Sequence, residues 1–361
     1  MSNKEELTLV FLGHSQYGKR GGIRIFESLT EVCKEKGINT IVSTVITNRN
    51  SMGISDLDIL IKQYAQINNI LKKVKGRVII ITSTEMFADI LPAILIKLKR
   101  RNVKLVAPIY HFVIPKFRQK LDYGALFHVF IQKLEILLVT KFFDGIITEN
   151  SYVEKVLLNK NPRLKIIKKS PGVNKIFMID NEKVKKDIDA VFLGALTKFK
   201  GVFDLLEVWK DINKDGKFKL VIAGYADYNT VQSVNDYIVH NSIRNVELKP
   251  NISEEEKFKL LDRAKLYVLP SYVEGIPITF YEAWSRRAVV VTYYLPTYID
   301  IKDYIIAARL GDLNDLKEKI LYALENYDDI VRKVANNAMK YSIEHEFEKV
   351  TSEMCEEILK F

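Results

Sequence analysis

Residues 266–284 read LYVLPSYVEGIPITFYEAW, an apolar strand-like run, a short loop and a segment of helical character. The apolar run ends at Ser271, the loop carries Glu274 and Gly275, and Pro277 suits the first turn of a helix. A buried strand that leads through a short loop into a helix is the repeating unit of a parallel α/β sheet. The stretch therefore predicts a βα unit, with a ligand site in its loop.

The same unit recurs in both halves of the chain. Expected strands cover residues 7–13, 40–46, 77–83, 103–109, 144–150, 189–194, 218–224, 246–250, 266–271 and 288–293. Expected helices cover about residues 24–36, 56–75, 87–100, 121–140, 151–158, 201–213, 229–240, 253–264, 278–286, 314–325 and 328–361. Strands that alternate with helices in two series predict an α/β protein with two doubly wound, Rossmann-like domains. We place the domains at residues 1–172 and 173–334, and expect the helix at about 335–361 to pack back on the first.

Bulk composition limits the class of protein. The 361 residues suffice for two domains, and 48% hydrophobic with 28% charged residues is ordinary for a globular protein. Cys33 and Cys355 lie far apart in sequence and do not support a disulfide framework, which favours a reducing compartment and cytoplasmic location. The chain starts with polar residues rather than a recognisable secretory signal, and no uncharged apolar run approaches the roughly 18 residues of a membrane span.

The net charge of +10 leaves several partners open. A basic chain can bind nucleic acid, an anionic membrane or an anionic substrate, or can simply carry a lysine-rich, solvated surface. No basic run is interleaved with aromatic residues in the manner of a nucleic-acid motif. Nucleic acid is therefore the least favoured of these partners.

Ligands of doubly wound sheets bind outside the carboxyl ends of the strands, so the loops there hold the candidate site. The first loop, GHSQYGKRGG (13–22), carries Gly21 and Gly22, which would let backbone N–H groups approach an anion. It lacks the GxGxxG dinucleotide pattern and could also be a flexible loop. His111 follows another strand, where a histidine is either catalytic or structural.

Two further loops carry charges. Lys198 and Lys200 precede a helix that opens near Gly201, and lysines at a helix start suit a phosphate. In the loop quoted above, backbone N–H groups around Gly275, Ile276 and Ile278 suit a diphosphate or sugar hydroxyls.

A second acid lies deeper in the same helix. Glu282 is five residues beyond Pro277, or about 7.5 Å along a helix axis, which is roughly the span from a diphosphate to its ribose. The plainer interpretation is that Glu274 and Glu282 are one acid at a helix start and one on the surface. The DLD of SDLD (55–58) matches an Asp-x-Asp metal motif, but Ser55 with Asp58 fits a capping box better. We expect no metal site.

Taken together, these loops resemble those of glycosyltransferase family 4, retaining enzymes of the GT-B fold. Glu274 and Glu282 match the E-x7-E motif of that family, and Lys200-Gly201 match its lysine before the first helix of the second domain. PGVN (171–174), followed by Phe177, matches the inter-domain segment, and IAG (222–224) matches a strand end. The resemblance covers nearly the whole chain and is more specific in the second half.

The resemblance implies a role for each position. It implies that Glu274 contacts the donor sugar hydroxyls, Glu282 the ribose, and Lys200 with Gly22 the diphosphate. His111 would lie near the reacting centre, and the base would be held near Tyr225, Asn251 and Ile252. The resemblance also implies an N-terminal acceptor domain, a C-terminal nucleotide-sugar donor domain, and a metal-independent front-face transfer with retention.

One departure from the family pattern affects the phosphate site. The family usually has Gly-Arg-Leu where this chain has Gly194, Ala195 and Leu196, so a charged phosphate contact is missing. Lys198 or Arg24 would have to replace it. Without a replacement, the chain could be a non-catalytic GT-B scaffold.

We therefore expect a hexosyltransferase that uses a UDP- or GDP-sugar and a glycan or lipid-linked acceptor. The apolar and basic stretch at 112–143 predicts peripheral contact with an anionic membrane on its inner face, although a buried helix would give a similar pattern. A scaffold or partner subunit and a DNA-modifying glucosyltransferase are the alternatives, and a nucleotide-sugar epimerase matches less well.

Overall fold

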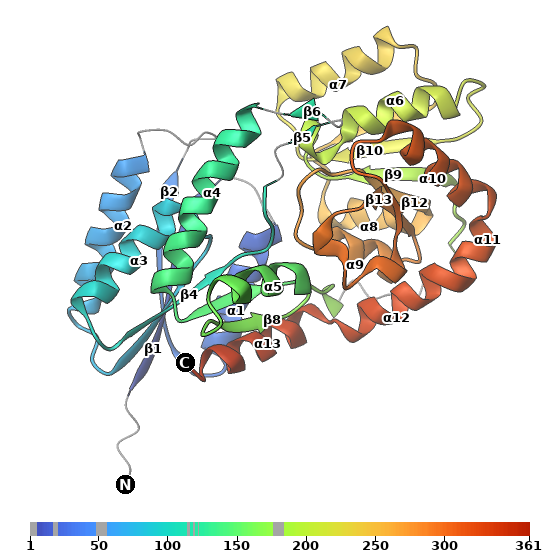
Figure 1. Cartoon of the computed structure of the whole chain (residues 1–361). Helices are drawn as coiled ribbons and strands as arrows, with labels where there is room; N and C mark the ends of the chain where they lie inside the picture. Colours follow the sequence, from blue (N-terminus) through green and yellow to red (C-terminus); the bar gives the residue numbers. More distant parts are fainter. Residues whose placement is uncertain are drawn as a thin grey trace. The chain divides into compact units, whose positions relative to one another are not determined.

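The computed structural model describes residues 6–16, 21–47, 56–113, 116–117, 120–121, 123–175 and 184–361. The described chain divides into two compact units, each with its own parallel six-stranded sheet (Figure 1). Unit 1 comprises Met1–Phe112, Phe127–Ser170 and Glu348–Phe361, and unit 2 comprises Val113–Leu126 and Pro171–Phe347. The predicted α/β class with two doubly wound sheets is confirmed.

Unit 1 orders its strands β2-β1-β3-β4-β7-β8. Its elements are β1 (Leu7–Gln16), α1 (Gly21–Glu35), β2 (Asn39–Thr47), α2 (Asp56–Leu71), β3 (Arg77–Thr82), α3 (Phe87–Lys99), β4 (Val103–Pro108), α4 (Tyr123–Phe142), β7 (Gly145–Thr148), α5 (Ser151–Lys160) and β8 (Lys165–Lys168). Consecutive residues of the inner strand β1, from Leu9 to Leu12, are fully buried, so both faces of the sheet are covered there.

Unit 2 orders its strands β11-β10-β9-β12-β13-β14. Its elements are β9 (Ile188–Leu193), α6 (Val202–Ile212), β10 (Leu220–Gly224), α7 (Tyr228–His240), β11 (Val246–Pro250), α8 (Glu254–Arg263), β12 (Ala264–Leu269), α9 (Ile278–Ser285), β13 (Val289–Tyr293), β14 (Ile306–Ala308), α10 (Leu313–Glu325), α11 (Tyr327–Ile330) and α12 (Asn336–Glu344). A short antiparallel pair, β5 (Lys116–Phe117) with β6 (Lys120–Leu121), precedes α4 in the chain. Because β9, β10 and β12 are neighbours, the loops after them emerge at one edge of the sheet.

The end of the chain is not one continuous helix. A π-helical turn at Val331–Ala335 precedes α12, and the helical run breaks at His345 before α13 (Phe347–Ile358) begins. Helix α12 belongs to unit 2, where it packs on α9, and the chain joins unit 1 only from Glu348 onward.

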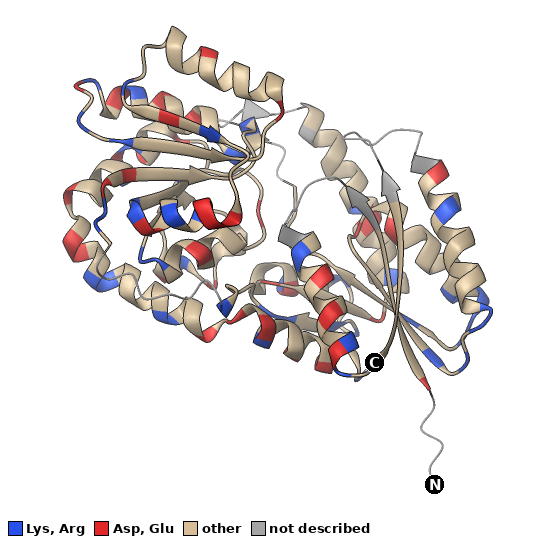
Figure 2. Cartoon of the chain, turned by 180° about the vertical axis from the view of Figure 1, so that it is seen from behind, with Lys and Arg blue, Asp and Glu red and all other residues tan. Residues whose placement is uncertain are grey.

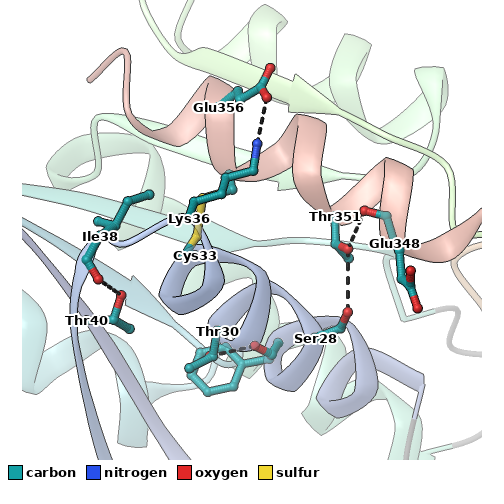
Figure 3. The surroundings of a disulfide bond; sticks show 11 residues. Ser28, Thr30, Cys33, Lys36, Ile38, Thr40, Glu348, Thr351 and Glu356 are labelled. Carbon is teal, nitrogen blue, oxygen red and sulfur yellow. Dashed lines mark hydrogen bonds and ion pairs between the residues drawn. A yellow bond between two sulfur atoms is a disulfide. The ribbon is translucent and has the colours of Figure 1, made fainter.

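Helix α13 is fixed to α1 by covalent and polar contacts (Figure 3). Cys33 forms a disulfide with Cys355 at a Cα–Cα distance of 6.0 Å, and Lys36 pairs with Glu356 at 2.6 Å. The expectation of unpaired cysteines is therefore wrong. The number of residues between the two cysteines did not indicate their distance in the fold. The chain returns to unit 1 with α13, which brings Cys355 to Cys33 on α1. The cysteines therefore do not favour a reducing compartment.

Candidate functional site

Two glycines bring the loops after β9 and β10 into contact. Gly224 has a φ of +145°, and a Cβ on it would lie 1.8 Å from the carbonyl oxygen of Gly194. The N–H of Leu196 donates to the carbonyl of Tyr225 at 3.1 Å. A larger residue at Gly224 would clash with backbone that cannot yield, so glycine is required for this close approach.

A second set of contacts joins the loop after β9 to the loop after β12. The carbonyl of Phe199 accepts hydrogen bonds from the N–H of Tyr272 at 2.8 Å and from Oγ of Ser271 at 3.1 Å. Gly201 adopts a φ of +78°, and a Cβ there would lie 2.0 Å from the carbonyl oxygen of Pro270. These contacts hold the short helix at Lys198–Lys200 against the loop that carries Glu274.

The ammonium group of Lys200 forms a direct ion pair with the carboxylate of Glu274. The Lys200 side chain is 33% exposed and that of Glu274 is 12% exposed, so solvent reaches the pair. Thr297 Oγ1 donates to the carbonyl of Glu274 at 3.0 Å and fixes the loop from its other side. Helix α9 begins at Ile278 with Pro277 as its N-cap, close to where the sequence placed it.

Glu282 lies on α9 in a different environment. Its side chain is 2% exposed, and its Oε1 pairs with Nζ of Lys257 at 2.7 Å. Lys257 is itself 11% exposed and also pairs with Glu254 at 2.8 Å. Lys257 is not among the residues predicted from the sequence. It stands in the charged run EEEK (254–257) on α8, a pattern typical of surface residues.

A buried tyrosine joins the end of β9 to the first turn of α9. The hydroxyl of Tyr267 donates to the carbonyl of Leu193 at 2.9 Å and lies 2.8 Å from Oγ1 of Thr279. Burial raises the pKa of Tyr267 well above its usual range, the bond to Thr279 opposes that rise, and the charges of Glu274 and Glu282 add to it. The phenol therefore stays protonated and keeps its donor role at all physiological pH values.

Asn251 joins the loops that are expected to hold the nucleotide base. Its N–H donates to the carbonyl of Gly224 at 2.8 Å, and its amide bonds both backbone groups of Ala226, at 3.2 and 2.9 Å. The amide side chain is thus used within the loop. Tyr225 is 63% exposed beside it, and Ile252 is partly buried against the core.

The loop after β9, where the family usually has an arginine, carries the exposed Lys198. Ala195 is half-buried after β9. Lys198 is exposed, and its Nζ lies 4.8 Å from the ring centroid of Phe199. Replacement of the family arginine by Lys198 stays a prediction. Arg24 lies on α1 of unit 1.

In unit 1, His111 follows β4 at the ligand edge and is half-buried. Nε2 of Gln132, a buried residue of α4, donates to the carbonyl of His111 at 3.1 Å and to Glu85 Oε1 at 3.3 Å. The side chain of Gln132 therefore fixes the backbone that carries His111.

Glu135 lies one turn further along α4 and is a feature that the sequence analysis missed. It accepts a hydrogen bond from the N–H of Phe87 at 2.9 Å. Burial raises the pKa of Glu135 to about 7, the bond from Phe87 opposes the rise, and the charges of Glu85 and Asp89 add to it. An acid next to an apolar helical run was the only sequence signal for this group.

The remaining predicted positions are less informative. Gly21 and Gly22 open α1, but residues 17–20 of their loop lie outside the described residues. Ser55 of the Asp-x-Asp segment also lies outside them, and α2 begins at Asp56. Phe177 after the inter-domain segment is likewise not described. Within the described ranges, no group of three or more His, Cys, Asp or Glu side chains has the arrangement of a metal site.

Comparisons with known proteins agree with the geometry of unit 2. Residues 174–341 match the family model described as Glycosyl transferases group 1. This part of the chain, most of unit 2, is therefore similar to a group 1 glycosyltransferase domain. The match contains Lys200, Glu274 and Glu282, and it bears out the family resemblance at this level.

Two sequence relatives are a glycolipid synthase and a glycosyltransferase by name. The alpha-galactosylglucosyldiacylglycerol synthase of Streptococcus pneumoniae is 29% identical over 162 residues, 42% of this chain and 41% of that protein. An uncharacterized glycosyltransferase of Methanocaldococcus jannaschii is 25% identical over 289 residues, 74% of this chain and 71% of that protein. The chain thus spans less than half the length of the pneumococcal relative.

The fold is shared with solved structures over the whole chain. The Anabaena protein HepE, solved with UDP and glucose, is 14% identical with a TM-score of 0.70, and the likeness covers 99% of each chain. At this identity the likeness shows the fold alone, and it confirms the GT-B assignment.

Proposed function

We propose that this protein is a retaining hexosyltransferase. It moves the sugar of a nucleoside-diphosphate sugar to a glycan or lipid-linked acceptor by a metal-independent front-face reaction. The observation that carries the proposal is the solvent-reached Lys200–Glu274 pair, held at the loop edge of a group 1 glycosyltransferase domain. Lys200 supplies a positive charge for the diphosphate of the donor. Glu274 supplies a hydrogen-bond acceptor for the hydroxyls of its sugar.

Donor binding exchanges the partners of this pair. The ammonium of Lys200 moves from Glu274 to the diphosphate, where a charge-assisted contact forms. The carboxylate of Glu274 is then available to accept hydrogen bonds from sugar hydroxyls. Backbone N–H groups at Gly275 and Ile276, before α9, add donors to the phosphate side. Lys198 adds charge on the same side.

The chemistry that follows is electrostatic. As the bond between the anomeric carbon and the diphosphate oxygen breaks, negative charge grows on the diphosphate, and Lys200 with the N–H groups stabilises it. The leaving diphosphate takes the proton of the acceptor hydroxyl while that oxygen bonds to the anomeric carbon on the same face. No protein nucleophile is required, and retention of configuration follows.

The other residues position the reactants. Ribose hydroxyls would share the carboxylate of Glu282 with Lys257. The base would lie on Tyr225 and on the backbone at Asn251 and Ile252. His111, held by Gln132, would face the acceptor from unit 1.

The comparisons favour particular substrates. HepE was solved with UDP and glucose bound, which supports a UDP-sugar over a GDP-sugar for this chain. The name of the pneumococcal relative supports a lipid acceptor. Peripheral contact with an anionic membrane is a separate proposal, which does not depend on the transfer reaction. No helix among the described residues has the length and apolarity required to span a bilayer.

A donor screen in the presence of EDTA tests the proposal. UDP- and GDP-sugars are added singly to the full chain, and thermal shift and slow donor hydrolysis are recorded. We expect one nucleotide sugar to stabilise and to be hydrolysed with retention, and Glu274→Gln to lower hydrolysis by about 100-fold or more. Glu255→Gln, at a side chain 77% exposed on α8, is the matched control and should behave as wild type.

Three outcomes would contradict the proposal. Activity that is lost with EDTA and restored by a divalent cation would contradict the metal-independent mechanism. An inverted product would contradict retention. No shift with any nucleotide would favour the non-catalytic scaffold.

A further inference from the structure

Helix α4 presents a row of apolar side chains to solvent. Phe127, Phe130, Leu134 and Leu137 are 63%, 57%, 38% and 60% exposed. They follow one another at intervals of three or four residues, so they lie along one side of the helix. We call these four residues the α4 apolar face.

Two polar side chains of α4 point inward instead. Gln132 and Glu135 are 7% and 4% exposed, and both make the inward hydrogen bonds described above. Glu135 is the only carboxylate in the sequence of α4. An ordinary surface helix turns its apolar residues inward. Helix α4 buries Ile136 and Val139 in this way and has the exposed α4 apolar face in addition. An outward face of this kind is suited to a partner other than water.

The charges around the α4 apolar face are basic. Lys133 and Lys141 on α4 are exposed, and neither pairs with a carboxylate in the part of the chain that the structure describes. The neighbouring α3 is joined to α4 where Nζ of Lys97 donates to the carbonyl of Phe142 at 2.7 Å. It adds Leu98, which is 67% exposed, and the exposed Lys99. Figure 2 shows α4 mostly without charged residues.

We propose that the α4 apolar face docks on an anionic lipid bilayer. Aromatic and leucine side chains insert between head groups, while Lys133 and Lys141 approach the lipid phosphates. The inward position of Glu135 removes the one negative charge that would oppose this contact. A bilayer matches both features, because it presents an apolar layer beneath a negative surface.

Docking places the candidate acceptor region close to the membrane. The N-terminal end of α4 lies at the edge of the sheet where the parallel strands end, since a crossover helix runs antiparallel to its strands. Gln132, beside the α4 apolar face in sequence, holds the backbone of His111. An acceptor lipid in the same bilayer would need to move little to reach this edge. The approach of an acceptor lipid rests on the proposed function. The docking of the α4 apolar face does not.

Vesicle flotation of the full chain tests the proposal. Vesicles of phosphatidylcholine alone and of phosphatidylcholine mixed with phosphatidylglycerol are compared at low and high salt. We expect binding to the anionic vesicles, weaker at high salt. Phe130→Ser with Leu137→Ser should reduce it by about tenfold or more, and Lys133→Gln with Lys141→Gln by about fivefold for each lysine.

Tyr322→Ser is the matched control, because Tyr322 is an aromatic residue 53% exposed on α10 of unit 2. It should bind vesicles as wild type does. Thermal melting shows that each variant is folded, and thermal shift with UDP-sugars separates failed docking from failure of the proposed function. No flotation with anionic vesicles would overturn the proposal. So would equal binding to neutral vesicles, or lipid-free self-association that disappears in the Phe130→Ser, Leu137→Ser variant.

Discussion

The two glutamates of the E-x7-E motif each pair with a lysine, but the two pairs differ in burial. The Lys200 and Glu274 side chains are 33% and 12% exposed and lie on loops. The Lys257 and Glu282 side chains are 11% and 2% exposed and lie on two packed helices, α8 and α9. A motif defined by spacing thus contains one pair that solvent reaches and one that it scarcely reaches.

The two pairs therefore have different roles. One can exchange its partners for a ligand, and the other supports the structure. A solvent-reached pair contributes little to stability and can give its partners to a ligand at little cost. A buried pair is different, because a charge left without its partner in a dry environment is strongly unfavourable. We therefore assign donor exchange to Lys200–Glu274 and a fixed, positioning role to Lys257–Glu282.

The largest expected effect comes from breaking the buried pair. Lys257→Met leaves the carboxylate of Glu282 without its cation and should lower the free energy of unfolding by about 3–5 kcal/mol. Urea denaturation measures this change. Lys259→Met, at an exposed lysine of the same helix, is the control and should change the free energy of unfolding by less than about 0.5 kcal/mol.

A double variant sharpens this prediction. Adding Glu282→Gln to Lys257→Met removes the uncompensated charge and should recover much of the lost stability. Equal stability of Lys257→Met and Lys259→Met would contradict the assignment of the buried pair.

Glu135 extends the comparison to a buried carboxylate that accepts its hydrogen bond from a backbone N–H, that of Phe87. Its pKa is about 7 in the folded chain against 4.5 as the ordinary value. The folded state therefore holds a proton that the unfolded state loses between these values, so stability should fall as pH rises from about 4.5 to 7. Glu135 contributes about 2–3 kcal/mol to this loss of stability.

Glu135→Gln should remove this contribution. The variant should be more stable than wild type above pH 7 and should lose less stability between pH 5 and 8, as followed by thermal and urea denaturation. Glu318→Gln, at an exposed acid of α10, should keep the wild-type pH dependence. A Glu135→Gln curve parallel to that of wild type would show that Glu135 titrates normally.

The smallest effect on stability is expected at the solvent-reached pair. Lys200→Gln should change the free energy of unfolding by no more than about 1 kcal/mol, because solvent screens the pair. Urea denaturation of Lys200→Gln beside Lys257→Met compares the two pairs directly. A loss at Lys200 as large as that at Lys257 would remove the distinction between them.

Much of the fold followed from the sequence. The alternation of buried strands and helices gave the two sheets, and the glycine and proline positions around α9 gave its start within about two residues. These features depend on local periodicity and on backbone sterics, which a single sequence displays. Lys200 and Glu274 were both selected, because each stands in a loop directly after a strand.

The rest depended on contacts between distant segments. Lys257 looked like a surface residue, since its helix is acidic and polar, and only packing against α9 buries it with Glu282. The pairing of Cys33 with Cys355 required the return of α13. The exposed apolar face of α4 was hidden because a buried apolar helix and an exposed one have the same composition, and only the structure shows that Phe130 is exposed and Glu135 is buried.

Affinity for UDP and for a UDP-sugar, measured by calorimetry on Lys200→Gln and Glu274→Gln, tests the central claim most directly. The account predicts that Lys200→Gln weakens both ligands by about tenfold, through loss of a charge-assisted contact to phosphate. Glu274→Gln should not weaken UDP but should lose the extra affinity that the sugar confers. Equal weakening of both ligands by Glu274→Gln, or no effect of either substitution, would contradict the exchange of partners at this pair.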